Sequence, residues 1–239
     1  MAAPGIYSFQ AKLPRIVGVK NTVKRLANGM HTAAILLLCL ATCTVSINVP
    51  APVDVFMPLL EPQVLRYRIP ALVRTGKGTL IAFAEERTDP LVDCAYKWIT
   101  ARRSVDNGTT WGPPIDVVGA GNKSLATGNP QVVFHAASGR VVLAFGVKIL
   151  PPSGFVYCSP GDGVFVVDDG GTDGEKWGVP RNISSMLGGL AEWGALIPGP
   201  GTGTVMTSAS NYAGRIVFSG SVGAYGRDVA FYSGVVTKF

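Results

Sequence analysis

The residues of this 239-residue sequence whose types could do chemistry include arginines and aspartates between positions 68 and 93. A planar guanidinium such as that of Arg68 or Arg87 can grip a carboxylate through paired hydrogen bonds, which lysine cannot reproduce. An aspartate such as Asp89 or Asp93 can act as a general acid and base when its surroundings tune its pKa. By residue type alone these groups would form ordinary surface ion pairs. Their positions in the fold must therefore decide whether they form a functional site.

Residues suited to metal or phosphate chemistry are scarce. His31 and His135 are the only histidines, and no cysteine pair has the spacing of a zinc site. The glycine-rich segment Gly199–Gly203 lacks the strand–turn–helix setting of a phosphate loop. We therefore expect neither a metal site nor a cofactor.

The arginines lie in a region that is typical of short β-strands separated by turns. Arg66–Arg74 alternates apolar with more polar residues, which predicts a strand whose polar face carries Arg68. Thr79–Glu85 and Lys97–Ser104 predict a second and a third strand, and Ile115–Val118 predicts a fourth.

The same pattern then begins again, twice. The predicted strands are Gln131–His135, Arg140–Phe145 and Gly163–Val167 in the second cycle, and Gly214–Phe218 and Asp228–Tyr232 in a third that begins near Gly194. No segment shows convincing helical periodicity. The sequence therefore predicts an all-β domain over residues 51–239.

Two of these cycles share a turn in which Asp, Gly and Trp follow a strand. Ser104–Pro114 and Thr172–Pro180 both show it, and Trp111 and Trp177 are 66 residues apart, with the second copy one residue short. A turn module repeated at this spacing favours a β-propeller, whose blades have four antiparallel strands. A β-sandwich with two Asp-Gly hairpins is the alternative.

Three of these segments resemble motifs of the sialidase (neuraminidase) family. Ser104–Trp111 (SVDNGTTW) resembles the family's Asp box, and Tyr67–Pro70 (YRIP) resembles its Tyr/Phe-Arg-Ile-Pro motif. Phe83–Arg87 (FAEER) is similar to the Phe-Ala-Glu-x-Arg strand, and motif order and spacing also fit. The resemblance implies a six-bladed β-propeller of the sialidase type, of which residues 51–239 would supply about three to four blades.

The resemblance also implies an exo-α-sialidase, a retaining glycosidase that releases terminal sialic acid from glycoproteins, glycolipids or oligosaccharides. Arg68 would hold the carboxylate of the sialylated substrate, and Arg87 would lie beside the sugar's O4 and the acid/base. Asp93 is favoured over Asp89 as the acid/base by its spacing from Arg87, and Asn129 would also lie near O4.

The family's tyrosine nucleophile, its activating glutamate and its further arginines are not identifiable in this chain. Glu192, Arg215, Arg227 and Tyr232 are available, but none stands in a matching motif. The alternative to an active enzyme is a catalytically inactive Asp-box propeller fragment that binds glycans or proteins. An unrelated Asp-box propeller is a third possibility.

The N-terminal arm carries most of the formal charge of +6, because five basic residues precede the first acidic residue, Asp54. The basic balance therefore does not indicate a nucleic-acid partner. The apolar run Ala33–Val45 follows the basic residues in the order of a signal peptide, and the longer run 30–49 would form a signal anchor. A transit peptide or a buried element of the domain is the alternative.

Residues 1–50 therefore predict entry into the secretory pathway, with a product that is secreted or membrane-anchored, at the lysosome or cell surface. Membrane association would run through residues 30–49. Export would permit a disulfide between Cys94 and Cys158.

Overall fold

The chain divides into two units, Met1–Ala51 and Pro52–Phe239, and every strand named below belongs to the second. The computed structural model describes residues 51–57, 66–89, 92–152, 162–187, 195–207, 213–223 and 230–236. The predicted arm at residues 1–50 lies outside this range. No helix within the described ranges is long and apolar enough to cross a membrane.

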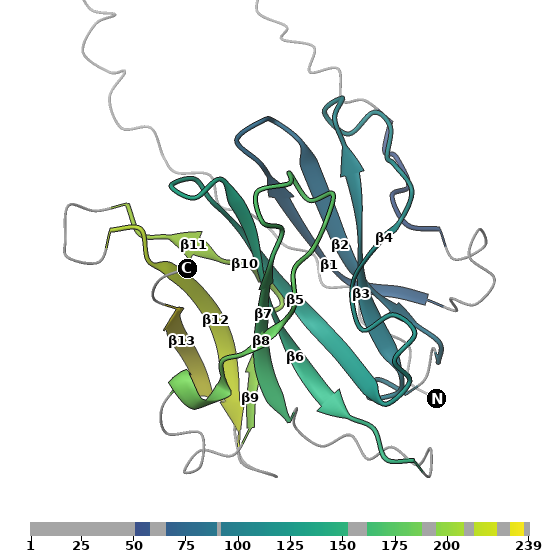
Figure 1. The fold of residues 1–239 in the computed structure, drawn as a ribbon. Coiled ribbons are helices and arrows are strands. Elements are labelled where there is room, and N and C mark those ends of the chain that lie inside the picture. Colours follow the sequence, from purple (N-terminus) through teal and green to yellow (C-terminus); the bar gives the residue numbers. More distant parts are fainter. Residues whose placement is uncertain are drawn as a thin grey trace, which may run out of the picture. The chain divides into compact units, whose positions relative to one another are not determined.

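The first four strands form an antiparallel sheet in chain order, which we call blade 1 (Figure 1). Its strands are β1 (Arg66–Arg74), β2 (Leu80–Arg87), β3 (Lys97–Ser104) and β4 (Ile115–Val118). The predicted bounds of β1, β3 and β4 match those observed. The second strand continues two residues beyond its predicted end, and these two residues, Glu86 and Arg87, belong to the charged end of the sheet.

Blade 2 repeats this arrangement of four antiparallel strands. Its strands are β5 (Leu125–His135), β6 (Arg140–Ile149), β7 (Gly163–Asp168) and β8 (Arg181–Asn182), followed by one 3-10 turn, η3 (Ser184–Leu187). A single parallel pair, Lys97 with Ala126, connects β3 to β5.

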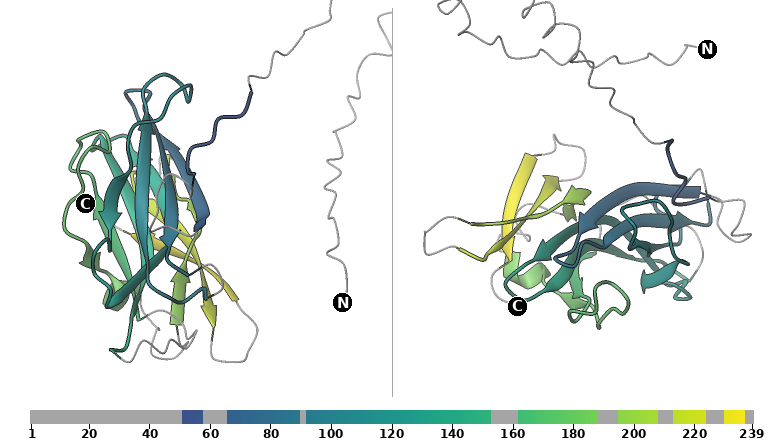
Figure 2. Two further views of the ribbon diagram at one scale, coloured as in Figure 1. Left: turned by 90° about the vertical axis from the view of Figure 1, so that its right-hand side faces the viewer. Right: turned by 90° about the horizontal axis from the view of Figure 1, so that it is seen from above.

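Blade 3 has an inner strand in three pieces, followed by two long strands. The pieces are β9 (Ala195–Pro198), β10 (Gly201–Thr202) and β11 (Thr204–Val205), and the long strands are β12 (Ile216–Gly223) and β13 (Ala230–Val236). Both β9 and β11 pair with β12, whereas β10 pairs in parallel with β5 of blade 2. Seen from above, blade 2 lies between blades 1 and 3 (Figure 2). The described strands form part of a propeller ring.

Blade 2 is apolar on both faces because each face packs against a neighbouring blade. Leu143 and Phe145 on β6 belong to the core shared with blade 1, which includes Phe83. Val142 and Ala144 point to the other face, into the core shared with blade 3. The continuous apolar run in β6 therefore follows from its central position in the ring.

Each inner strand is interrupted by a proline that follows a residue with positive φ. The φ angles of Ile69, Asn129 and Gly199 are 55°, 55° and 50°, and Pro70, Pro130 and Pro200 come next. The strand register shifts at the first two of these points. Positive φ is unfavourable for a branched residue such as isoleucine, so the bulge is held by the surrounding structure.

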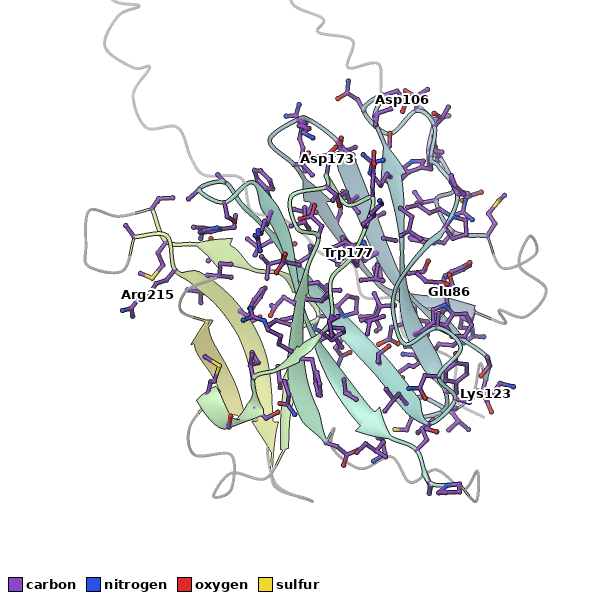
Figure 3. All side chains as sticks on the ribbon, viewed as in Figure 1. Glu86, Asp106, Lys123, Asp173, Trp177 and Arg215 are labelled. Atoms are coloured by element: carbon purple, nitrogen blue, oxygen red, sulfur yellow. The ribbon has the colours of Figure 1, made fainter. Side chains whose placement is uncertain are left out.

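The two Asp-box turns lie at the same end of blades 1 and 2, where Figure 3 labels Asp106 and Asp173. In the first turn the carboxylate of Asp106 accepts the Thr110 N–H at 2.9 Å and the Ser104 hydroxyl at 2.7 Å. The Thr110 hydroxyl also donates to this carboxylate, and the hydrogen bonds from Thr110 and Ser104 lower the pKa of Asp106 to about 2. Ser104 in turn accepts the Gly108 N–H at 2.8 Å.

The second turn corrects the pairing that the sequence suggested. Thr172 takes the place of Asp106, because its hydroxyl accepts the Lys176 N–H at 3.0 Å. Asp169 takes the place of Ser104, since its Oδ2 accepts the Gly174 N–H at 2.8 Å. Asp173 has the left-handed φ of Asn107, and the second copy is one residue longer, not shorter.

Because Thr172 takes the place of Asp106 in the second turn, the Asp173 carboxylate is available to connect blade 2 to blade 1. Its Oδ2 accepts the Thr79 hydroxyl at 2.6 Å and lies 3.1 Å from Nη2 of Arg103. The Trp177 ring that follows packs edge-on against Phe83 of blade 1, with 5.5 Å between ring centroids. The second Asp-box turn therefore holds the two blades together.

We predict that Asp173→Ala lowers the free energy of unfolding by about 2 kcal/mol, because it removes charge-assisted hydrogen bonds from a buried position. Glu175→Ala is the matched control, since Glu175 contacts the same Arg103 at 3.2 Å from an exposed position and should change stability little. Urea unfolding followed by circular dichroism measures both. Equal losses in the two variants would contradict a connection specific to Asp173.

Candidate active site

The charged residues of blade 1 lie on the same face of the sheet as its core residues, at one end of that face. Side chains of alternate residues share one face of a strand, so Glu85 and Arg87 follow Ile81 and Phe83 on the side that faces blade 2. In the sheet, Arg68 lies opposite Glu85 and Lys97 lies opposite Arg87. Three neighbouring strands thus place their charges at the same end of this face.

Glu85 is the centre of this cluster, and its side chain is fully buried. The Arg87 guanidinium donates through Nε at 2.8 Å and through Nη2 to the same Oε2. Lys97 Nζ lies 3.2 Å from this oxygen, and the Asn129 N–H donates to Oε1 at 2.7 Å. A buried carboxylate needs such partners, because an unpaired buried charge is strongly unfavourable.

Asp93 joins the cluster from the loop between β2 and β3. Its Oδ1 lies 2.5 Å from Nη1 of Arg87 and 3.8 Å from Nζ of Lys97, and its side chain is 65% exposed. Partial burial acts to raise the pKa of Asp93, but the charges of Lys97, Arg87 and Arg68 outweigh it and hold this pKa below its usual value.

Asp89, the other candidate, has a different role in the same loop. Its Oδ1 accepts the Val92 N–H at 3.0 Å, as in a turn closed by an aspartate. Arg87 therefore reaches Asp93 while the carboxylate of Asp89 organises the loop backbone.

Arg68 is exposed at the rim of the cluster, on the inner strand of blade 1. Among the described residues, none is hydrogen bonded to its guanidinium or forms an ion pair with it. Its charge adds to those of Lys97 and Arg87 in lowering the pKa of Asp93. A guanidinium in this position can take an anionic ligand.

Asn129 lies at the bulge of β5 rather than in a turn that begins a strand. Its backbone N–H holds Glu85, and its φ of 55° is the left-handed conformation that asparagine tolerates best after glycine. The structure thus brings Arg68, Arg87, Asp93 and Asn129 to one region.

Glu85, Lys97 and Gly128 complete the cluster, and the sequence did not single them out as site residues. A β-carbon added at Gly128 would lie 2.4 Å from Oε1 of Glu85 and 2.9 Å from Cε of Lys97. Only glycine leaves room there for the two side chains to meet. Glu85 could have been found from its place on the apolar face of β2, where a charged residue needs a partner.

Of the remaining candidates, Arg215 is the one whose side chain the structure describes. Arg215 lies at blade 3, far across the ring from the labelled Glu86 of β2 (Figure 3). Glu192, Arg227 and the side chain of Tyr232 are outside the described part of the structure. Within the described ranges, no group of three or more His, Cys, Asp or Glu side chains could hold a metal ion.

Cys94 directly follows Asp93 and is disulfide-bonded. The other three cysteines, Cys39, Cys43 and Cys158, lie outside the described residues. The Cys94–Cys158 pairing therefore stays a prediction.

Comparisons with known proteins agree on one class. The chain is 28% identical over 155 residues to human Sialidase-4, a match that covers 60% of this chain and 31% of that protein. The Hadza microbial sialidase Hz136 matches with a TM-score of 0.58 and 26% identity, over 67% of this chain and 33% of that one. No protein-family model matches the chain.

The fold is also shared with the Trypanosoma rangeli sialidase in complex with sialic acid, at a TM-score of 0.56 and 19% identity, over 72% of this chain and 29% of that one. The class is therefore an incomplete β-propeller of the sialidase type. The chain is similar to proteins of the sialidase family, and it spans about a third of the length of the relatives it matches.

We predict that Gly128→Ala destabilises the protein by about 1–3 kcal/mol through overpacking. The added methyl group would press on a Glu85 side chain that Arg87, Lys97 and Asn129 hold in place, so it has nowhere to move. Gly112→Ala is the control, because the nearest atom to its added β-carbon is 3.5 Å away. Urea unfolding midpoints report the difference, and a Gly128→Ala variant as stable as the control would contradict the close packing described.

Proposed function

We propose that this chain is an exo-α-sialidase, or the N-terminal part of one, that releases terminal sialic acid from glycoconjugates. The observation that supports this most is the arrangement of Arg68, Arg87 and Asp93 at one end of blade 1, in a chain similar to sialidases. Such a cluster offers one guanidinium to an anionic sugar and one carboxyl group to the leaving oxygen.

Arg68 would bind the carboxylate of sialic acid. This group is attached to the anomeric carbon, so a bidentate guanidinium contact would also fix the position of the glycosidic bond. The exposure of Arg68 and the absence of a described side-chain partner suit this role, since binding would not require a protein ion pair to break.

Asp93 would be the general acid that protonates the glycosidic oxygen and the base that later activates water. Its contact with Arg87 would orient the carboxyl group toward the sugar. Only the protonated form of Asp93 can donate this proton, and the lowered pKa of Asp93 restricts that form to acidic solution. We therefore expect hydrolysis to be favoured at acidic pH.

Sialidases use a tyrosine nucleophile, and the described residues place none at this cluster. This observation favours a second candidate, a catalytically inactive propeller fragment that binds sialylated glycans through Arg68. The two candidates differ in turnover, not in the anionic sugar that they recognise.

We also propose that the chain enters the secretory pathway, at the lysosome, at the cell surface or outside the cell. The disulfide bond of Cys94 supports an oxidising compartment. Membrane association through residues 30–49 stays a prediction.

We predict that Arg68→Ala lowers the affinity for 3′-sialyllactose about 30-fold or more, because a charge-assisted hydrogen bond contributes about 2 kcal/mol. Arg74→Ala is the matched control, since Arg74 is an exposed arginine at the other end of the same strand. Saturation-transfer NMR titrations measure both. Equal affinity in the wild type and Arg68→Ala would exclude an Arg68-centred site, and binding without hydrolysis would favour the inactive fragment.

We predict that Asp93→Asn slows hydrolysis of 3′-sialyllactose about 100-fold or more, because its leaving group needs a proton. An aryl sialoside, whose leaving group needs less protonation, should lose less activity. Asp89→Asn is the control and should leave both rates near those of the wild type. A greater loss in Asp89→Asn than in Asp93→Asn would assign the acid/base to Asp89 instead.

A further inference from the structure

Lys97 is the one lysine of the charged cluster, and its side chain is 12% exposed. It is the first residue of β3 and lies opposite Arg87 in the sheet. Its Nζ lies 3.2 Å from Oε2 of Glu85 and 3.8 Å from Oδ1 of Asp93. The ammonium group therefore contacts both carboxylates of the cluster.

The room for this side chain is provided by blade 2. Gly128 lies beside it, and a β-carbon there would be 3.0 Å from Nζ of Lys97. The next residue, Asn129, donates its N–H to the other oxygen of Glu85 at 2.7 Å. Lys97 is thus enclosed by residues of both blades, unlike an exposed lysine whose ion pairs change with each rotamer.

Among the described residues, Lys97 is one of the two cations that contact both carboxylates of the cluster, and Arg87 is the other. Two carboxylates, Glu85 and Asp93, face Arg87 and Lys97, and Arg68 lies at the rim. If Lys97 were uncharged, Arg87 would be the one described cation left in contact with both carboxylates, with Arg68 at the rim. Two carboxylates that share too little positive charge cannot both stay ionised, and one of them then takes up a proton.

We propose that Lys97 is a positioning residue, which holds the carboxylates of Glu85 and Asp93 on either side of its ammonium group. This inference rests on the proposed function, because it assigns Lys97 to the acid/base of that reaction. Lys97 would touch neither the sugar nor the leaving oxygen, and it would act through Asp93. Its charge would keep Asp93 ionised in the resting protein, so that the acid form is present only in acidic solution.

The sign of the effect follows from the groups that face Asp93. Arg68 on β1, Arg87 on β2 and Lys97 on β3 stabilise its ionised form, whereas Glu85 on β2 opposes it. Removing the charge of Lys97 therefore raises the pKa of Asp93. The alkaline limb of kcat/KM, where the acid form is lost, should move to higher pH by the same amount.

The test is a carbon-13 NMR titration of aspartate-labelled full chain, with the Asp93 signal assigned from Asp93→Asn. We expect the Asp93 titration to move to higher pH in Lys97→Met and Lys97→Gln and to return toward the wild type in Lys97→Arg. Lys123→Met is the matched control, because Lys123 is an exposed lysine on the turn before β5. It should leave the titration unchanged, and circular dichroism checks that each variant is folded.

An unchanged Asp93 titration in folded Lys97→Met or Lys97→Gln overturns the proposal. So does the failure of both uncharged variants to fold while Lys97→Arg folds, because the role of Lys97 would then be structural. The titration needs no substrate, so a wild type that neither binds nor cleaves sialosides would contradict the proposed function alone. With turnover, an alkaline limb that stays in place while the titration moves also overturns the proposal.

Discussion

The buried carboxylate of Glu85 is the interaction on which the described part of the propeller depends at its functional end. A fully buried carboxylate is tolerated only where cations and hydrogen-bond donors surround it, and here the partners come from both blades. Arg87 and Lys97 approach from blade 1, and the Asn129 N–H approaches from blade 2. The same contacts that neutralise Glu85 therefore set the position of one blade against the next.

At their opposite end, blades 1 and 2 are connected by a second buried carboxylate. There the carboxylate of Asp173 reaches from blade 2 to Thr79 and Arg103 of blade 1. Between the two polar ends, the apolar face of blade 1 around Phe83 packs against Leu143 and Phe145. Apolar burial and dispersion stabilise the middle of the interface between the two blades. Charge-assisted hydrogen bonds at its two ends depend on direction, so they set how the blades are aligned.

Much of the fold could be predicted because β-strands carry a local signal. The alternation in Arg66–Arg74 and the turn around Asp106 depend on neighbours in sequence, so their bounds were predicted well. The inner strand of blade 2 was predicted to begin at Gln131, yet β5 begins at Leu125. The Asn-Pro sequence at its bulge is typical of a turn. The segment is a strand because residues before and after the bulge both pair with β6.

The sequence by itself determined the all-β class, the repeated turns and the identity of the arginine and aspartate candidates, because these depend on residue type and short spacing. The tertiary structure decided that Glu85 and Lys97 join them, that Gly128 makes room, and that Asp173 takes the place of Asn107 rather than Asp106. The physical reason is that these features depend on contacts between strands and between blades, beyond the local sequence. A residue's partner across an interface is not encoded in its own strand, and a buried charge shows its partners only once the blades are packed together.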